Sequence, residues 1–212
     1  MPGAVWTIVV AAGSGTRFGG AKQFAELDDR RVIDWACEPA GEVSDGVVLV
    51  VPPPDVDAHT VAGGATRAES VRRGLAAVPS DAAIVVVHDA ARPFAGVDLF
   101  TAVIDAVGAG ADGAVPAVTV ADTIKEVDSD GVVVATPDRS RLVAVQTPQA
   151  FRADVLRRAH AGGAEGTDDA ALVEAAGGRV VTVPGDPANR KITEPADLDW
   201  ARQRVSGGAC RP

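Results

Sequence analysis

The sequence predicts an α/β protein with a mostly parallel sheet flanked by helices. Short apolar runs rich in β-branched residues alternate with segments that have helical periodicity. One later segment breaks this alternation with two short runs around a tight turn. At 212 residues and 47% hydrophobic composition, the chain is long enough for one ordinary core, so we expect a single domain over residues 1–212.

Three apolar runs are predicted to be strands. The first covers residues 5–11 and ends at a glycine-rich stretch, and the second covers 47–51 and stops at three prolines. The third covers 84–87 and ends in His88 and Asp89. Because these runs lack polar alternation, both faces of each strand are expected to be covered, as in a parallel, Rossmann-like sheet.

Helices are expected between and after these strands, each beginning at a polar or acidic cap. Thr66 and Glu69 have the spacing of a capping box. Glycines at 108 and 110 end the second helix, and glycines at 177 and 178 end the third. The expected caps are Thr66, Asp98, Thr167 and Thr193, the last followed by Pro195.

A β-hairpin is predicted at residues 123–136. The runs 123–127 and 132–136 flank Asp128-Ser129-Asp130-Gly131, which is a favourable turn sequence. An isolated hairpin is only marginally stable in water. The segment at about 121–140 is therefore either an excursion from the sheet edge or a projecting arm that packs on another subunit.

The charge of the chain excludes some classes of partner. The net charge is -9, and the 20 basic residues include only three lysines, Lys22, Lys125 and Lys191. This balance argues against nucleic-acid binding, and no apolar stretch is long enough to span a bilayer. Cys37 and Cys210 lack the spacing of a zinc site, and the start of the chain does not resemble a secretory leader. We expect a soluble cytoplasmic protein.

The segment from Ala11 to Lys22 is the most informative part of the sequence. It follows the first strand, where open α/β sheets place their ligand crevice. Its small residues allow backbone N–H groups to approach phosphate oxygens, and Arg17 and Lys22 add positive charge. Phe18 excludes a dinucleotide fingerprint, and Ala21 excludes a P-loop. The segment is a different phosphate-binding loop, or a glycine-rich turn with two surface cations.

Six motifs in order resemble one known family. Together they resemble the 2-C-methyl-D-erythritol 4-phosphate cytidylyltransferases, from about residue 5 to about residue 200. The motifs are Ala11-Ala12-Gly13-x-Gly15-x-Arg17 with Lys22-Gln23, Val87-His88-Asp89-Ala90-Ala91-Arg92-Pro93, Asp122-Thr123, Gln146-Thr147-Pro148-Gln149, Thr167-Asp168-Asp169-Ala170 and Asn189-x-Lys191-x-Thr193-x-Pro195.

The resemblance implies transfer of a cytidylyl group from CTP to a polyol phosphate, with Mg²⁺ as cofactor and release of pyrophosphate. An ionised phosphate monoester is already a nucleophile, so the protein must hold two anions in line and neutralise their charge. By resemblance, Arg17, Lys22 and Lys191 are the catalytic residues. The alternative for Lys191 is an ordinary surface lysine after a loop.

The resemblance also implies two sets of binding residues. The nucleotide would contact Ala11, Ala12, Gly13, Gly15, Gly64, Ser70, Asp89 and Ala90. The polyol phosphate would contact Arg92, Thr123, Arg139, Thr147 and Thr167, with Thr123 and Arg139 reaching the neighbouring subunit's site in a homodimer. Asp89 is the candidate metal ligand; otherwise Mg²⁺ would be bound only through the CTP phosphates.

Several of these residues also have structural interpretations. Ser70 fits the first turn of a capped helix, and Thr167 fits a helix cap. Arg92 fits a loop salt bridge, and Arg139 an exposed turn. A relay of Ser14, His88 and Asp89 is disfavoured, because neighbouring strand residues point to opposite faces. His88 is expected to pack inside the protein.

Three positions depart from the family pattern. Ala21 stands where proline is usual, Ala65 where an acidic residue is common, and Asp169 where glutamate is more usual. None of these departures removes a proposed cation. Two other functions remain open: transfer to another polyol phosphate such as ribitol 5-phosphate, and nucleotide binding without catalysis. The intact set of cations argues against the second.

Overall fold

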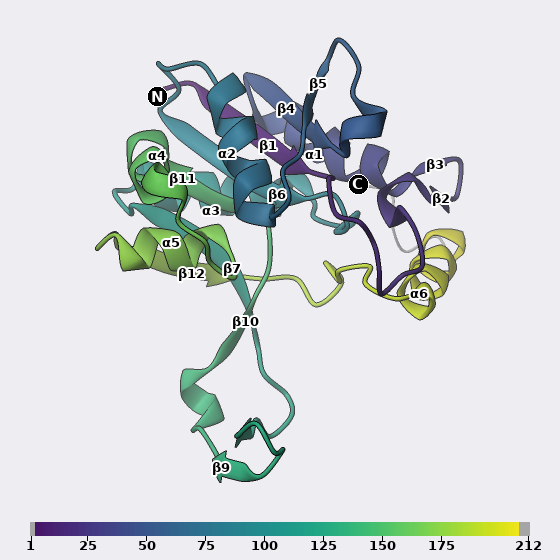
Figure 1. The fold of residues 1–212 in the computed structure, drawn as a ribbon, viewed down its shortest axis with the longest axis vertical. Coiled ribbons are helices and arrows are strands. Elements are labelled where there is room, and N and C mark those ends of the chain that lie inside the picture. The colour runs from purple at the N-terminus through teal and green to yellow at the C-terminus, as the bar shows by residue number, and fades with distance from the viewer. Residues whose placement is uncertain (1–2, 208–212) are drawn as a thin grey trace.

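The computed structural model describes residues 3–207, so Cys210 lies outside the described residues. Its centre is an eight-stranded sheet in the order β10-β7-β11-β6-β1-β4-β5, with β12 also paired to β7 (Figure 1). The strands of this sheet are β1 (Val5–Val10), β4 (Gly46–Val51), β5 (Thr60–Ala62), β6 (Ile84–Asp89), β7 (Gly113–Thr119), β10 (Val143–Val145), β11 (Gln149–Arg152) and β12 (Val180–Pro184).

The sheet is mostly parallel, as predicted. Strand β1 pairs in parallel with both β4 and β6, so that Trp6 lies opposite Gly46 and Val85. The pairs β4–β5 and β7–β12 are also parallel, whereas β11 and β10 run antiparallel to their neighbours. All three predicted strands are present, and β6 extends through Asp89. The predicted α/β fold class is confirmed.

Helices cover both faces of the sheet. Helices α2 (Arg67–Ala77), α4 (Ala153–Ala159) and α5 (Asp169–Ala175) bury their apolar side chains with Ile8, Val50 and Val87. On the other face, α1 (Val32–Val43) and α3 (Val97–Gly108) pack against Val9 and Val86. Because alternate strand residues face opposite sides, Asp89 lies on the α2 face and His88 on the α3 face.

One predicted cap is confirmed, and three are wrong by one or two residues. Thr66 accepts a hydrogen bond from the Glu69 N–H at 3.0 Å. Helix α3 is capped by Gly96, and Asp98 lies in its first turn instead. Asp168, not Thr167, caps α5, accepting from the Ala171 N–H at 2.9 Å.

The last helix, α6 (Pro195–Ser206), is capped by Glu194 rather than by Thr193. The Asp197 carboxylate accepts from the N–H groups of Glu194 at 2.9 Å and Thr193 at 2.8 Å. In both helices, the cap is an acidic residue that follows the predicted threonine: Asp168 in α5 and Glu194 in α6. A carboxylate is a charged acceptor, which makes a stronger hydrogen bond than a hydroxyl does.

A hairpin arm projects from the sheet beyond β7 and β10 (Figure 1). It contains β8 (Glu126–Val127) and β9 (Val133–Ala135), which pair antiparallel with an irregularity in register. In the turn, the Asp128 carboxylate accepts from Val132 N–H at 2.9 Å, and Gly131 has a φ of +81°. Every residue from 121 to 136 is exposed. The predicted hairpin is therefore confirmed, with shorter strands.

The chain returns from β12 along the carboxyl edge of the sheet before it forms α6 (Figure 1). Buried Asn189 anchors this return, donating to the Thr147 carbonyl at 2.9 Å. Helix α6 then packs its Leu198 and Ala201 with Leu27, Trp35 and Ile192 in a separate apolar cluster. The remaining elements are the short strands β2 (Glu26–Leu27) and β3 (Arg30–Arg31) and the 3₁₀ turns Lys22–Phe24, Pro53–Asp55, Arg139–Arg141 and Ala161–Gly163.

Within residues 3–207, no helix has both the length and the apolar character needed to cross a membrane.

Candidate active site

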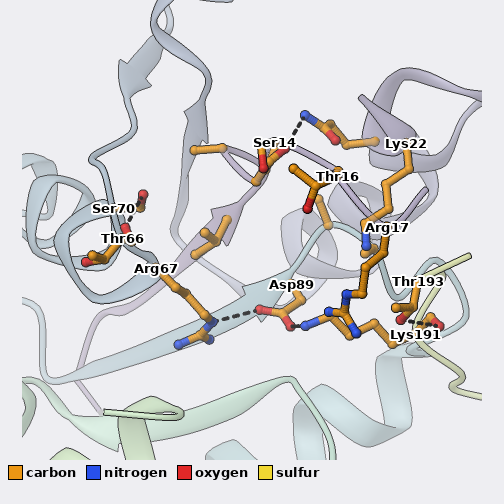
Figure 2. Close-up of a pocket in the computed structure, with 18 of the residues that line it drawn as sticks. Ser14, Thr16, Arg17, Lys22, Thr66, Arg67, Ser70, Asp89, Lys191 and Thr193 are labelled. Atoms are coloured by element: carbon orange, nitrogen blue, oxygen red, sulfur yellow. Dashed lines mark hydrogen bonds and ion pairs between the residues drawn. The ribbon is translucent and has the colours of Figure 1, made fainter. Parts of the chain in front are cut away.

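A pocket of about 450 Å³ opens at the carboxyl ends of β1 and β6 (Figure 2). Four chain segments line it: the loop after β1, the start of α2, the end of β6 and the segment before α6. Open α/β sheets bind their ligands at this edge. The topology therefore brings together residues that lie up to about 180 positions apart in the sequence.

The loop after β1 curls back on itself at Gly15. The Gly15 carbonyl accepts from the N–H groups of Phe18 and Gly19, both at 2.9 Å, and its φ is +63°. A Cβ at Gly15 would lie 1.8 Å from the Gly20 carbonyl oxygen, so this turn requires glycine. The curl directs Arg17 and Lys22 to the pocket, which both residues line.

Four cationic side chains among residues 3–207 line this pocket, and three of them, which the sequence nominates, lack enough anions in the pocket to balance them. Arg17, Lys22 and Lys191 all line it, and Asp89 is its only carboxylate within the described chain (Figure 2). Burial lowers the pKa of the Lys22 ammonium, and repulsion by Lys191 and Arg17 lowers this pKa further. An anionic ligand would relieve this repulsion, so the electrostatics favour a phosphate-rich ligand.

Asp89 lies at the end of β6 between two cations (Figure 2). Its Oδ1 accepts from Arg67 Nε at 3.1 Å, and its Oδ2 accepts from Lys191 Nζ at 2.6 Å. Burial raises the pKa of this carboxyl, but Arg67 and Lys191 outweigh burial and hold the pKa well below its usual range. Asp89 is therefore ionised in the folded protein and ties the start of α2 to the segment before α6.

His88 faces away from Asp89, as expected for neighbouring strand residues. Its ring lies 5.0 Å from the Phe100 ring, and its Nδ1 lies 3.1 Å from Thr147 Oγ1. Burial lowers the pKa of His88 to about 4, so the imidazole is neutral near pH 7. His88 is a packed core residue, and a triad with Ser14 does not form.

Ser70 and Gly64 form the wall opposite the cations. The Ser70 hydroxyl donates to the Thr66 carbonyl at 2.9 Å and accepts from the Gly64 N–H at 3.0 Å. The Ala65 N–H donates to the Glu69 carboxylate at 2.7 Å, so a carboxylate lies beside residue 65, one of the positions that depart from the family pattern. Ser70 is buried in the first turn of α2 and shapes the backbone of this wall, as its structural interpretation expects, whereas its contact with a nucleotide stays a prediction.

The pocket assembles most of the residues that the sequence nominates, but not the polyol-phosphate set. The residues that line it are Ala11, Ala12, Gly13, Gly15, Arg17, Lys22, Gly64, Ser70, Asp89, Ala90 and Lys191. The residues absent from its lining are Arg92, Thr123, Arg139, Thr147 and Thr167.

Arg92 and Thr147 lie next to the pocket and support it. Arg92 Nη1 donates to the Asn189 carbonyl at 2.8 Å, which helps to fix the segment that carries Lys191. Buried Thr147 accepts from the Asp89 N–H at 3.0 Å. Thr167 is exposed just before α5.

Thr123 and Arg139 lie on the exposed arm, which extends away from the body of the same chain (Figure 1). Arg139 Nη1 donates to the Ala121 carbonyl at 2.7 Å across the base of the arm. Lys125, also on the arm, donates to Thr136 Oγ1 at 2.7 Å.

Sequence reasoning missed Arg67, which lines the pocket and binds Asp89. Arg67 is the first residue of α2, where a positive charge opposes the helix dipole. That unfavourable placement was the available signal, because such a cation needs anionic partners.

The described residues contain no group of three His, Cys, Asp or Glu side chains arranged to hold a metal ion. Mg²⁺ is commonly held by one or two carboxylates together with substrate phosphates. The two hydrogen bonds to Asp89 leave acceptor capacity on its oxygens. The donor set therefore fits a magnesium ion that arrives with a triphosphate and does not fit a protein-only cage.

Comparison with known proteins identifies the family of the chain. The family model described as "IspD: 2-C-methyl-D-erythritol 4-phosphate cytidylyltransferase" matches residues 5–206. A cytidylyltransferase of that name from Frankia casuarinae is 46% identical over 208 residues, covering 92% of this chain and 78% of the relative. A bifunctional IspD/IspF enzyme from Solidesulfovibrio magneticus is 43% identical over 92% of this chain, which spans 55% of that enzyme's length.

A solved structure gives the same result at the level of the fold. The crystal structure of 2-C-methyl-D-erythritol 4-phosphate cytidylyltransferase from Thermus thermophilus superposes with a TM-score of 0.81 at 33% identity. The match covers 94% of this chain and 98% of the other. With the cationic pocket at the same edge of the sheet as the sequence motifs, the chain belongs to the 2-C-methyl-D-erythritol 4-phosphate cytidylyltransferase family.

Proposed function

We propose that this chain carries out the reaction of its family, the transfer of a cytidylyl group from CTP to 2-C-methyl-D-erythritol 4-phosphate. The products are 4-diphosphocytidyl-2-C-methyl-D-erythritol and pyrophosphate. The observation that carries this proposal is the convergence of Arg17, Lys22 and Lys191 on one pocket. Repulsion by Lys191 and Arg17 helps to lower the pKa of Lys22 there. Such a centre is suited to a polyphosphate and to the charge that develops during phosphoryl transfer.

The chemistry is an in-line displacement. A phosphate oxygen of the polyol phosphate attacks the α-phosphorus of CTP, and the bond from that phosphorus to the β-phosphate oxygen breaks. The electron pair leaves with pyrophosphate, so no enzyme nucleophile is required. Arg17, Lys22 and Lys191 orient the two anions and stabilise the negative charge on the crowded phosphorus.

The rest of the pocket holds the nucleotide. The backbone of Ala11, Ala12, Gly13 and Gly15 approaches the phosphates, and the wall from Gly64 to Ser70 faces the base, with Asp89 and Ala90 toward the ribose. Asp89, together with the CTP phosphates, would hold Mg²⁺. When bound, this ion neutralises phosphate charge and orients the leaving pyrophosphate.

The polyol phosphate is proposed to bind beside the nucleotide, near Arg92, Thr147 and Thr167, with help from a second copy of the chain. Thr123 and Arg139 on the arm would contact the substrate in the neighbouring subunit of a homodimer, and Arg139 can bind a phosphate with two parallel hydrogen bonds. The exposed valines of the arm support this assembly, since monomers rarely expose such apolar patches. We further propose one nucleotidyltransferase domain over residues 1–212, with the arm at about 121–140, acting in the cytoplasm.

A pyrophosphate-release assay with a panel of substrates tests the proposed reaction. Each of CTP, UTP and ATP is combined with 2-C-methyl-D-erythritol 4-phosphate or ribitol 5-phosphate in the presence of Mg²⁺. We expect rapid release only with CTP and the methylerythritol phosphate. Faster release with ribitol 5-phosphate would assign another polyol substrate, and CTP binding without release would indicate a non-catalytic nucleotide-binding protein.

Two variants test the cationic centre. Lys22→Ala and Lys191→Ala should each lower kcat by about 10²–10³, the cost of removing one preorganised electrostatic contact. The control is Arg158→Ala, which removes an exposed cation paired with Asp154 on the far helix α4. A wild-type rate in either lysine variant would remove that residue from the mechanism.

A further inference from the structure

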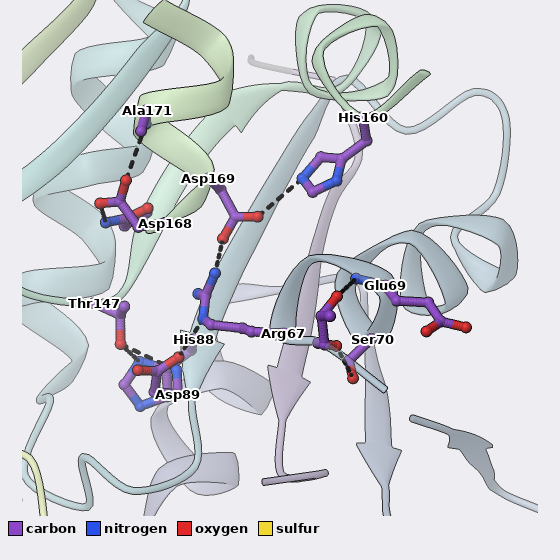
Figure 3. Close-up of polar contacts among 12 residues, drawn as sticks. Arg67, Glu69, Ser70, His88, Asp89, Thr147, His160, Asp168, Asp169 and Ala171 are labelled. Carbon is purple, nitrogen blue, oxygen red and sulfur yellow. Dashed lines mark hydrogen bonds and ion pairs between the residues drawn. The ribbon is translucent and has the colours of Figure 1, made fainter. Parts of the chain in front are cut away.

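A chain of polar and charged side chains runs from buried His160, through Asp169 of helix α5, into the pocket (Figure 3). His160 Nε2 lies 2.9 Å from Asp169 Oδ1, and the other Asp169 oxygen accepts from Arg67 Nη1 at 2.7 Å. Arg67 Nε then donates to Asp89 at 3.1 Å, and Asp89 accepts from Lys191 at 2.6 Å. Only the last three residues of this chain line the pocket.

The outer part of this chain is deeply buried. The side chains of Asp169 and His160 are 1% and 2% exposed, and that of Arg67 is 27% exposed. Burial lowers the pKa of Arg67, but Asp89 and Asp169 outweigh it and raise that pKa above its usual value. A buried ion pair is costly when one partner is lost, so Asp169 is not a dispensable surface charge.

The geometry fixes the orientation of Arg67. Its guanidinium binds one carboxylate through Nε and another through Nη1, and the planar group cannot rotate without breaking one of these contacts. Asp169 is itself held by His160 and by its place in the first turn of α5. With Arg67 fixed, one Asp89 oxygen is bound on the α2 side, and the other faces Lys191.

We propose that Asp169 is a positioning residue, which acts through Arg67 and Asp89 to hold Lys191 at the reacting phosphates. His160 supports it by fixing the carboxylate from behind. This inference rests on the proposed function of Lys191 and deepens it. Asp169 touches neither the pocket nor Lys191, so its effect on turnover must pass through the two residues between them.

The chain offers a matched control in the pair Arg72–Glu165. This pair also ties α2 to the segment before α5, with a distance of 2.9 Å, but neither residue lines the pocket or contacts Asp89. Glu165→Gln and Asp169→Asn each remove one negative charge from the same junction between helices. Only the second interrupts the path to Lys191.

A double-mutant cycle tests the proposal. We expect Asp169→Asn to lower kcat about tenfold or more, because a small displacement of a positioned group has effects of this size. In a Lys191→Ala background, the same change should cost less than about twofold, since the end of the path is gone. Asp169→Glu should recover most of the activity, and Glu165→Gln should keep the wild-type kcat. The CTP-induced rise in Tm is measured for every variant as a check of binding.

Three results would overturn the proposal: a wild-type kcat for Asp169→Asn, an equal fold loss with and without Lys191, or an equal loss in Glu165→Gln. If Asp169→Asn does not fold, Arg67→Lys replaces it, because lysine keeps the charge but cannot bind both carboxylates as a planar fork. Wild-type kcat in Arg67→Lys would equally overturn it. The proposed site fails separately, if Lys191→Ala alone is fully active.

Discussion

Lys22, in the loop after β1, has a pKa that differs from that of a free lysine side chain. It is partly buried, and the cations of Lys191 and Arg17 lie close enough to lower its pKa, whereas Asp89 raises it to a smaller extent. A lowered pKa means that the ammonium loses its proton at a lower pH than a free lysine does. The positive charge offered to CTP therefore falls as pH rises, before any arginine is affected.

The lowered pKa of Lys22 predicts where activity falls on the alkaline side, or alkaline limb, of the pH profile. For the wild-type chain, kcat/KM for CTP should fall as pH rises through the lowered pKa of Lys22. In Lys22→Arg, the guanidinium stays charged, so the limb should move to higher pH even though the maximum rate is reduced. Initial rates between about pH 7 and 10.5 measure this shift. An unchanged limb would show that another group controls it.

Among single residues, the sequence predicted the pocket residues whose charge or small size suits a phosphate-rich ligand. Arg17, Lys22, Lys191, Gly13 and Gly15 all line the pocket, because their positions after β1 and before α6 are set by the topology. It missed Arg67, because a cation at the start of a helix indicates a need for anionic partners but does not say which carboxylates they are. Only the three-dimensional position of Asp89 and Asp169 shows that Arg67 has two anionic partners.

The phosphate-binding loop depends on one glycine. A Cβ at Gly15 would collide with the Gly20 carbonyl at 1.8 Å, and the φ of +63° disfavours other residues. Gly15→Ala should therefore open the loop and lower CTP affinity at least about tenfold, with little loss of global stability, because the loop lies outside the core. Isothermal titration with CTP measures the affinity.

The control for this loop is Gly20→Ala, since a Cβ at Gly20 meets no atom within 4 Å and its backbone needs no left-handed conformation. It should bind CTP within about twofold of the wild type. Equal affinities for the two variants would contradict the role given to Gly15.

Helix α2 packs on the sheet through Gly74, where a Cβ would lie 2.7 Å from Ile8 Cγ2 and 3.1 Å from Val50 Cγ2. Alanine usually stabilises a helix relative to glycine by about 1 kcal/mol, but overpacking a core costs about 1–3 kcal/mol. Gly74→Ala should therefore lower the free energy of unfolding, by up to about 2 kcal/mol.

Gly41→Ala in α1 is the matched change without a steric conflict, because no atom lies within 4 Å of the added Cβ. It should raise the free energy of unfolding by about 0.5–1 kcal/mol. Urea unfolding of both variants compares them directly. If Gly74→Ala also raises the free energy of unfolding, the helix propensity of alanine outweighs the packing conflict at Gly74.

The elements that sequence patterns predicted were those with continuous apolar runs or a clear cap. Helix α1 was not predicted, because it contains Pro39 and begins after Arg31, which is not a preferred cap. Strand β7 contains Pro116, and the short β10 lies exposed at the sheet edge. These elements are stabilised by their neighbours in the sheet and core, and a local pattern does not contain that information.

Over the whole molecule, the arm concentrates exposed apolar side chains. Those exposed by more than half are Val127, Val132, Val133 and Val134. Covering such a surface with a second copy would remove it from water. The arm extends away from the body of its own chain, which is why we propose that Thr123 and Arg139 act in the pocket of a second copy.

Complementation tests this assembly. Arg139→Ala and Lys22→Ala homodimers should each be weakly active. Mixing them should restore up to about a quarter of the wild-type activity per dimer, because about half of the mixed dimers are heterodimers and each heterodimer contains one intact composite site out of two. The double change Val133→Asp with Val134→Asp should give monomers in sedimentation experiments and lose activity. An active monomer would contradict the composite site.

Lys191 lies 102 positions beyond Asp89 in sequence, although the two side chains touch. During synthesis, the loop after β1, the wall from Gly64 to Ser70 and Asp89 all emerge before the segment that follows β12. A chain that stops at β12 therefore lacks one of the cations proposed to bind the nucleotide. We expect such a chain to bind CTP more weakly than the full chain does.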